Sequence, residues 1–330
     1  MLVRVALAAV VALPLVAQQP ASSDRYLVLA TARTKTLRAE LDQAVAQGYS
    51  LVAGEPASDI LILEKKPASA QRKYLVNDNL FSAIKKGDYK GYRILPWSLS
   101  QSEYELGAIL ESLQEGELQP EYKLSSTVFT RNLQKDLTEA SASGYRAVAM
   151  TGLENQVALL EKSLAAGDTA TSYQLLATKR ISTIEKEIAE AASKGFKVIA
   201  ATGAGHEMLV LMEKQGEGQG NRDYRVISTT RTSTFEKEIN QAAATGYRIV
   251  PRTGAALRKG GLLTGGTYGY EQAIVMEKPP NTPSVRYLLV AAEREKTIQR
   301  ELNATPGECN IATMFLSYQE VLILLACPAQ

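Results

Sequence analysis

The sequence predicts an α+β fold made of six tandem βαββ repeats. Three observations lead to this prediction: one motif recurs along the chain, each copy changes from strand-like to helix-like patterning and back, and each copy is too short for a hydrophobic core of its own. Each repeat is expected to form a three-stranded antiparallel or mixed sheet of order 1-3-2 with one helix. The repeats are expected to pack on their neighbours.

A tyrosine opens an apolar, β-branched run in every copy, at successive intervals of 48, 48, 51, 51 and 63 residues. An acidic residue stands fourteen positions after each tyrosine, and in four copies a glycine followed by an aromatic residue stands after twenty-two. Repetition at a nearly fixed period is the signature of a repeat protein. The opening tyrosines are Tyr26, Tyr74, Tyr122, Tyr173, Tyr224 and Tyr287.

The expected boundaries follow from this motif and from the polar, Gly- and Pro-rich linkers between copies. The second copy is degenerate, with a short helix ending near Gly87 or Gly91, and the fifth carries a Gly-rich insertion. The predicted repeats are 26–66, 74–112, 122–162, 173–214, 224–278 and 287–327.

The fourth copy shows the predicted elements most clearly. Its opening strand covers 173–178, and Ser182 with Glu185 forms the pattern of a capping box at the start of a helix. Ser233 with Glu236 repeats this pattern in the fifth copy. Gly195 is expected to end that helix, because a left-handed residue is favoured there. The helix has one apolar stripe, made of Ile184, Ile188, Ala191 and Ala192.

The third strand of a repeat is apolar at consecutive positions, as in 60–63 and 208–212. A strand that is buried on one face alternates, whereas a strand buried on both faces does not. The third strand is therefore expected at the centre of its sheet, and a neighbouring repeat is expected to cover the face opposite the helix.

Charge and hydropathy indicate an exported protein. Lys and Arg number 37 against 35 Asp and Glu, so the basic excess typical of nucleic-acid binding is missing and no nucleic-acid partner is expected. Residues 1–17 have the pattern of a signal peptide, with cleavage near Ala17; an uncleaved anchor is the alternative. No later stretch is long enough to cross a membrane, and a periplasmic or secreted location is expected.

The two cysteines, Cys309 and Cys327, lie in the sixth copy. In an exported protein such a pair predicts a disulfide. A hairpin with its turn at Tyr318 places the two residues opposite each other, at a separation that a disulfide spans.

The insertion of the fifth copy, 252–270, is the preferred contact site. It is rich in glycine but lacks the phosphate-binding loop pattern, and loops on a rigid scaffold often carry binding. A plain extended hairpin tip is the alternative. The candidate contact residues are Arg258, Lys259, Tyr268 and Tyr270.

No catalytic, metal-binding or cofactor-binding constellation is recognisable in the sequence, and no cofactor is expected. The one histidine, His206, lies in a predicted hairpin turn and is interpreted as solvated. Trp97 is interpreted as core or inter-repeat packing. The recurring acids are interpreted as helix N-terminal charges. Four recurring arginines, seven residues after their tyrosines, are interpreted as solvated or paired, with a binding edge as the alternative: Arg33, Arg180, Arg231 and Arg294.

The repeat resembles a widespread small bacterial domain of unknown function. The resemblance rests on the Tyr-opened strand, the helix closing in Gly-aromatic, and the final apolar strand that ends in Lys. That family typically has Trp where this chain has Tyr49, Tyr145, Phe196 and Tyr247. The resemblance implies the fold of the repeat and no functional residues.

These features favour an exported, non-catalytic binding or scaffold protein with an envelope or other protein partner. The alternative is a small-molecule-binding or enzymatic protein whose site forms between repeats. A purely structural envelope component is a third hypothesis.

Overall fold

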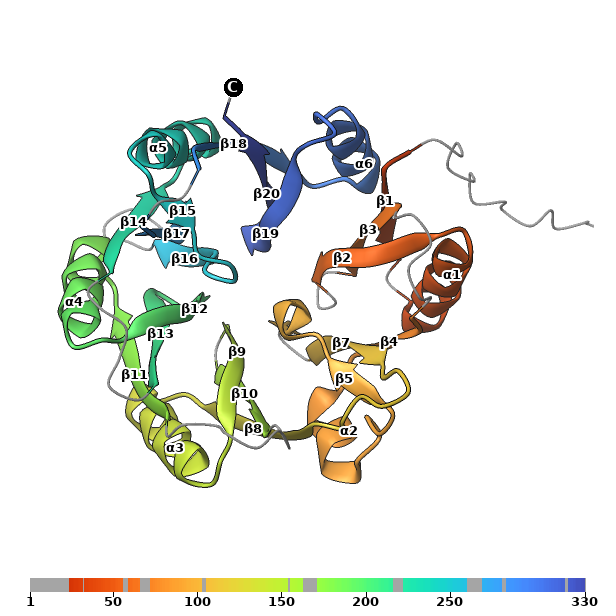
Figure 1. Cartoon of the computed structure of the whole chain (residues 1–330), viewed down its shortest axis with the longest axis horizontal. Coiled ribbons are helices and arrows are strands. Elements are labelled where there is room, and N and C mark those ends of the chain that lie inside the picture. The colour runs from red at the N-terminus through yellow and green to blue at the C-terminus, as the bar shows by residue number, and fades with distance from the viewer. Residues whose placement is uncertain are drawn as a thin grey trace, which may run out of the picture.

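The six repeats form a closed ring with the helices on its outer side (Figure 1). The computed structural model describes residues 24–31, 33–55, 59–65, 72–102, 105–153, 155–162, 171–215, 222–259, 269–280, 283–317 and 320–329. The predicted signal peptide at 1–17 and Tyr268 lie outside these residues. No helix in the described part of the chain is both long and apolar enough to span a membrane.

Each repeat contributes one antiparallel sheet in which the third strand lies between the first and the second, as predicted. The opening strands are β1 (Tyr26–Ala30), β4 (Tyr74–Asn77), β8 (Glu121–Thr127), β11 (Thr171–Thr178), β14 (Asp223–Thr229) and β18 (Val285–Ala292). The third, central strands are β3 (Ile60–Lys65), β7 (Leu106–Ser112), β10 (Gln156–Lys162), β13 (Glu207–Gln215), β17 (Gly269–Lys278) and β20 (Glu320–Pro328).

The second strands point toward the centre of the ring (Figure 1). Two repeats depart from the plain pattern: the second adds the 3₁₀ turn η2 (Pro96–Ser98) and the short strand β6 (Ser100–Gln101), and the fifth divides its second strand in two. The second strands are β2 (Tyr49–Glu55), β5 (Tyr92–Ile94), β9 (Arg146–Gly152), β12 (Lys197–Ala204), β15 (Arg248–Ile249) followed by β16 (Ala255–Lys259), and β19 (Asn310–Ser317).

The helices begin earlier than the capping-box pattern predicts. Arg180 and Arg231 are the N-cap residues, so Ser182 and Ser233 lie inside the first turn and the predicted capping boxes are wrong. Thr178 and Thr229 instead accept hydrogen bonds from the N-cap backbone N–H groups. The helices are α1 (Thr34–Ala46), α2 (Leu80–Lys86), α3 (Thr130–Ala142), α4 (Ile181–Ser193), α5 (Thr232–Ala244) and α6 (Glu295–Asn303).

Hydrophobic burial occurs mainly between repeats. In β3, Leu61 and Leu63 face the cluster that contains α1 and residues of the second repeat. Ile60 and Ile62 face the opposite cluster, which they share with the sixth repeat. Both faces of this strand are therefore buried, and it is uniformly apolar for that reason. The same division recurs at the other seams, so each helix is held between two sheets.

The opening tyrosines join each repeat to the one before it. In four seams the hydroxyl accepts a hydrogen bond from a backbone N–H of the preceding second strand, as from Ile94 to Tyr122 (3.0 Å) and from Ile249 to Tyr287 (2.9 Å). At the seam between the last and first repeats, the Tyr26 hydroxyl donates to the carbonyl of Cys309 (3.4 Å). One sequence motif thus makes a polar contact at five seams of the ring, in addition to the hydrophobic packing.

Amide side chains cover the outer edges of the opening strands. Asn240 on α5 accepts from the backbone N–H of Tyr287 and donates to its carbonyl, both at 2.8 Å. Asn303 on α6 makes the same pair with Tyr26 (2.8 and 2.9 Å). These bonds satisfy backbone groups that would otherwise form an open sheet edge. The last helix thereby closes the ring on the first strand.

Candidate functional site

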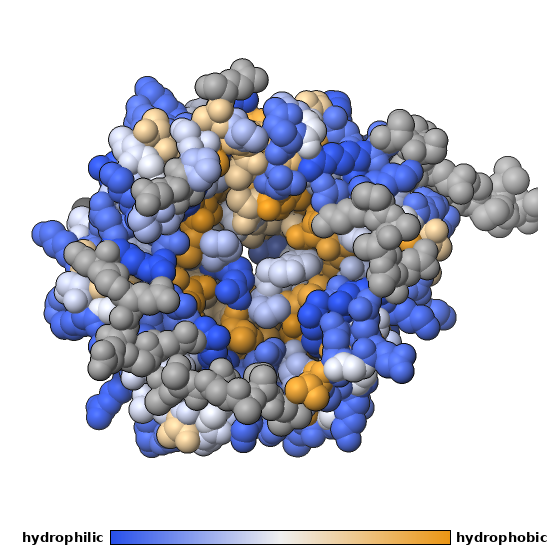
Figure 2. Space-filling model, in the orientation of Figure 1, coloured by the Kyte–Doolittle hydropathy of each residue, from blue (hydrophilic) through white to orange (hydrophobic). Residues whose placement is uncertain are grey.

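A cavity of about 330 Å³ lies where the six repeats meet. Figure 2 shows a hollow at the centre of the ring with hydrophobic and hydrophilic residues in its wall. Every repeat supplies lining residues. Six lining residues, one from each repeat in chain order, are Glu55, Trp97, Met150, Thr202, Arg252 and Met314. A concave, mixed-polarity space of this size is typical of small-molecule sites.

The inner strands approach one another closely enough to enclose this space. A Cβ on Gly203 would lie 2.1 Å from the carbonyl oxygen of Ala256 in the next repeat, and one on Gly254 would lie 2.1 Å from Cδ1 of Phe315. Only glycine permits these approaches. Bulges in β2, β9, β12 and β19 also bend these strands.

Arg252 is the cationic group of the cavity. Its backbone is left-handed, with φ of 62°, which is uncommon for a residue with a side chain. Its carbonyl accepts from the N–H of Ala201 (2.9 Å), and its Nη1 donates to the carbonyl of Val148. Burial lowers the pKa of Arg252, with an opposing effect from Glu213. The residue thus connects three repeats and is one of the residues that line the cavity.

Glu55 is the second ionisable group in the cavity wall. It ends β2 and is enclosed by protein, although the cavity leaves part of its side chain accessible. Burial raises its pKa to about 7, and a hydrogen bond from the backbone N–H of Leu316 acts in the opposite direction. Glu55 therefore changes its charge near neutral pH.

Trp97 belongs to η2 and packs on the hydrophobic cluster between the first two repeats. Its interpretation as inter-repeat packing is confirmed. It also lines the cavity, which the sequence did not indicate.

The candidate contact residues lie apart from the cavity wall. Arg258 and Tyr270 face each other in the β16–β17 pair, and Lys259 is paired with Gly269. Neither Arg258 nor Tyr270 is among the residues lining the cavity. The exposed Arg258 instead contacts the fourth repeat: its N–H donates to Gly205 O (3.1 Å), and its carbonyl accepts from Nδ1 of His206 (2.7 Å). His206 is exposed, as expected, but it has this inter-repeat contact.

The predicted disulfide is present. Cys309 and Cys327 are bonded, with their Cα atoms 4.2 Å apart, and Cys309 immediately precedes the Asn310–Ala326 pair of the hairpin. Because Tyr26 bonds to Cys309, the disulfide lies beside the seam between the last and first repeats.

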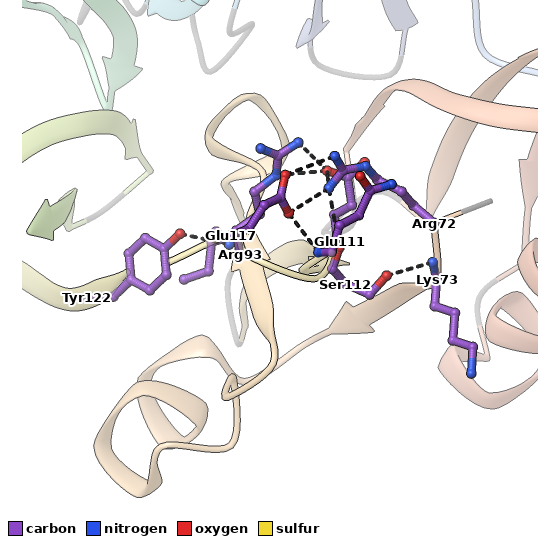
Figure 3. Close-up of polar contacts among 9 residues, drawn as sticks. Arg72, Lys73, Arg93, Glu111, Ser112, Glu117 and Tyr122 are labelled. Atoms are coloured by element: carbon purple, nitrogen blue, oxygen red, sulfur yellow. Dashed lines mark hydrogen bonds and ion pairs between the residues drawn. The ribbon is translucent and has the colours of Figure 1, made fainter. Parts of the chain in front are cut away.

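Charged side chains outside the cavity form structural pairs. Figure 3 shows Arg72 and Arg93 converging on Glu111 and Glu117, in the second repeat and the segments that flank it. Arg72 holds the pKa of Glu117 down to about 2. Two recurring acids accept a hydrogen bond from a hydroxyl in or directly after the opening strand of their own repeat: Glu40 from Thr31 (2.7 Å) and Asp136 from Ser125 (2.5 Å). The four recurring arginines are exposed N-cap residues, which agrees with their interpretation as solvated.

Within the described ranges, no group of three or more His, Cys, Asp or Glu side chains is placed to hold a metal ion. Arg252 and Glu55 could not be singled out from the sequence, because the residues that meet at the centre are far apart along the chain. Two sequence features could have pointed to the cavity: Pro251-Arg252, which interrupts the second strand of the fifth repeat, and the single tryptophan.

Comparison with known proteins gave no similarity: no family model, no curated protein and no solved structure matches this chain. The fold and the cavity define it as a closed ring of six βαββ repeats around a central cavity.

Proposed function

We propose that this protein is a non-catalytic, exported binding protein that takes a small molecule in its central cavity. The observation that carries the proposal is the convergence of all six repeats on one space of about 330 Å³. Small-molecule sites are typically concave, largely apolar and furnished with a few polar groups. The wall has this character, with apolar Met150 and Met314 beside Arg252, Glu55 and Thr202.

Export is supported by two independent features. Residues 1–17 have the pattern of a signal peptide, and the chain contains a disulfide, which persists in oxidising compartments. Together they favour a periplasmic or secreted location.

Native mass spectrometry of the protein purified from its own host tests the proposed function. We expect a mass for residues 18–330 less two hydrogens, accompanied by one additional small molecule per chain. A Met314→Trp variant, whose larger side chain fills part of the cavity, is expected to lack the additional mass. A bare chain in every preparation contradicts the proposal.

A second candidate function is binding of a protein partner by the insertion of the fifth repeat. It is favoured by exposed Arg258 at the end of a strand pair that extends beyond the rest of its sheet. Replacement of residues 260–268 by a short Gly-Ser linker is expected to leave the ring folded and to abolish the interaction in a host-lysate pull-down. Survival of every interaction after this replacement contradicts the second candidate.

A further inference from the structure

We propose that the ligand of the central cavity is a small organic anion, whose charged group binds the Arg252 guanidinium and whose apolar part lies against Trp97. This inference rests on the proposed function, because it specifies the chemistry of the ligand in the same cavity.

The hydrogen bonds of Arg252 are incomplete. A guanidinium has five N–H donors, and the structure pairs one nitrogen, Nη1, with the carbonyl of Val148. Among the described residues no carboxylate lies within ion-pair distance of Arg252. Glu213, which acts on it electrostatically, is already bonded to Arg146 (2.7 Å) and Lys197 (3.0 Å). A partly buried charge without a counter-ion is costly, so an anion in the cavity would complete the site.

The backbone of Arg252 supports a role in binding. Its φ of 62° lies in the left-handed region, where glycine fits without strain and arginine does not. Residues held in such conformations cluster at functional sites. The turn therefore has a conformational penalty at a position that lines the cavity.

The charge of the cavity favours an anion in the acidic and neutral range. Arg252 and Glu55 are the ionisable residues of the described lining. Asp59 immediately precedes β3 and Glu320 begins β20, and neither residue lines the cavity. Because burial raises the pKa of Glu55 to about 7, the wall has a net positive charge below that pH.

The apolar side of the cavity sets the size and shape of the ligand. Trp97, Met150 and Met314 line the same space as Arg252. A volume of about 330 Å³ corresponds to roughly ten water molecules at about 30 Å³ each. A ligand of roughly ten non-hydrogen atoms with one anionic group and a flat or branched apolar body fits these limits.

The test is isothermal titration calorimetry of the mature protein with benzoate and with its neutral analogue benzamide, at pH 6. We expect benzoate to bind one molecule per chain and benzamide to bind at least tenfold more weakly. Arg252→Gly is expected to weaken benzoate binding at least tenfold. The variant should fold normally, because glycine relieves the left-handed backbone. Arg252→Lys keeps the charge without the planar fork and is expected to have intermediate affinity.

Arg131→Gln, which removes an exposed arginine from the outer helix α3, is the matched control and should leave benzoate binding unchanged. Equal affinity for benzoate and benzamide, with no effect of Arg252→Gly, overturns the anion proposal while the cavity remains a binding site. Inorganic phosphate that displaces benzoate at equal concentration overturns the apolar half of the proposal. Absence of benzoate binding at millimolar concentration overturns the inference, and a bare chain in native mass spectrometry separately overturns the proposed function.

Discussion

The hydroxyl groups of the opening tyrosines show how single atoms join the repeats. Tyr287 is almost fully buried, and its hydroxyl accepts from the N–H of Ile249 across a seam. That N–H lies on the outer edge of the second strand, which pairs with only one strand of its own sheet. A buried donor without an acceptor is costly, so the hydroxyl has a defined energetic role.

Tyr287→Phe is expected to lower the free energy of unfolding by about 1–2 kcal/mol, because the N–H of Ile249 then remains buried without a partner. Urea denaturation followed by circular dichroism measures this change. Tyr145→Phe is the matched control: its hydroxyl bonds to exposed Glu121, which water can satisfy, and a change below about 0.5 kcal/mol is expected. Equal losses in the two variants contradict this account.

Glu55 makes stability depend on pH. Its pKa is about 7 in the folded protein and 4.5 as the reference for the unfolded chain, so the folded state holds the proton more tightly. The contribution of the Glu55 proton to stability is present in full below about pH 4.5. It falls as the pH rises to about 7, and it is lost above that pH. After allowing for its partial exposure to the cavity, the expected loss is about 2 kcal/mol.

The comparison of wild type with Glu55→Gln isolates this effect. Glutamine keeps an acceptor for the N–H of Leu316 but does not ionise, and all other titrating groups are shared. The difference in unfolding free energy between the two proteins is expected to change between pH 5 and pH 8 in favour of the variant. Parallel curves over that range rule out a raised pKa for Glu55.

At the residue scale, the roles of the tyrosines, the cysteines and the helix-ending glycines could be predicted from the sequence, because each type has a local or covalent preference. It did not mark Asn240 or Asn303, whose amides pair with the next opening strand, since their partners lie on another repeat. The capping boxes were wrong because Thr178 and Thr229, two residues before each N-cap, supply the turn contact instead.

At the scale of elements, the inner strands determine whether the centre can close. Gly203→Ala places a methyl group against the backbone of Ala256, which cannot move without shifting β16. We expect a loss of about 2–3 kcal/mol in unfolding free energy. Gly307→Ala, where a Cβ meets nothing within 4 Å, is expected to change stability by less than about 0.5 kcal/mol. Thermal and urea unfolding of both variants measure the difference, and comparable stabilities contradict this close approach.

The strand order was predictable because the apolar run of each third strand requires burial on both faces. The bulges, the 3₁₀ turn at Trp97 and the division of the second strand of the fifth repeat were not predictable. They depend on the curvature that brings six inner strands together. The sequence predicted a contact site in the segment 252–270, whose Arg252 and Gly254 line the cavity, but it did not predict that the other five repeats converge there.

At the scale of the whole molecule, closure makes every repeat depend on two neighbours. A linear array of repeats can lose a terminal unit and keep the rest. Here removal of the sixth repeat, 287–330, exposes apolar faces of both the fifth and the first. We expect that truncated protein to lose its native circular dichroism altogether. Retention of five folded repeats contradicts the expectation.

The full chain is correspondingly expected to unfold in one step. The fluorescence of Trp97, in the second repeat, and the far-ultraviolet circular dichroism of all repeats should follow a single urea transition. Two separate transitions show that part of the ring opens independently.

Closure also limits how this protein can evolve. The rotations from one sheet to the next must add up to one full turn, so a repeat can be neither gained nor lost without a change of angle at every seam. The second repeat, with its short helix of 80–86, is retained under this constraint because it fills one sector of the circle. Outside the buried positions of its two seams, its local sequence can therefore diverge, whereas the number of copies cannot change.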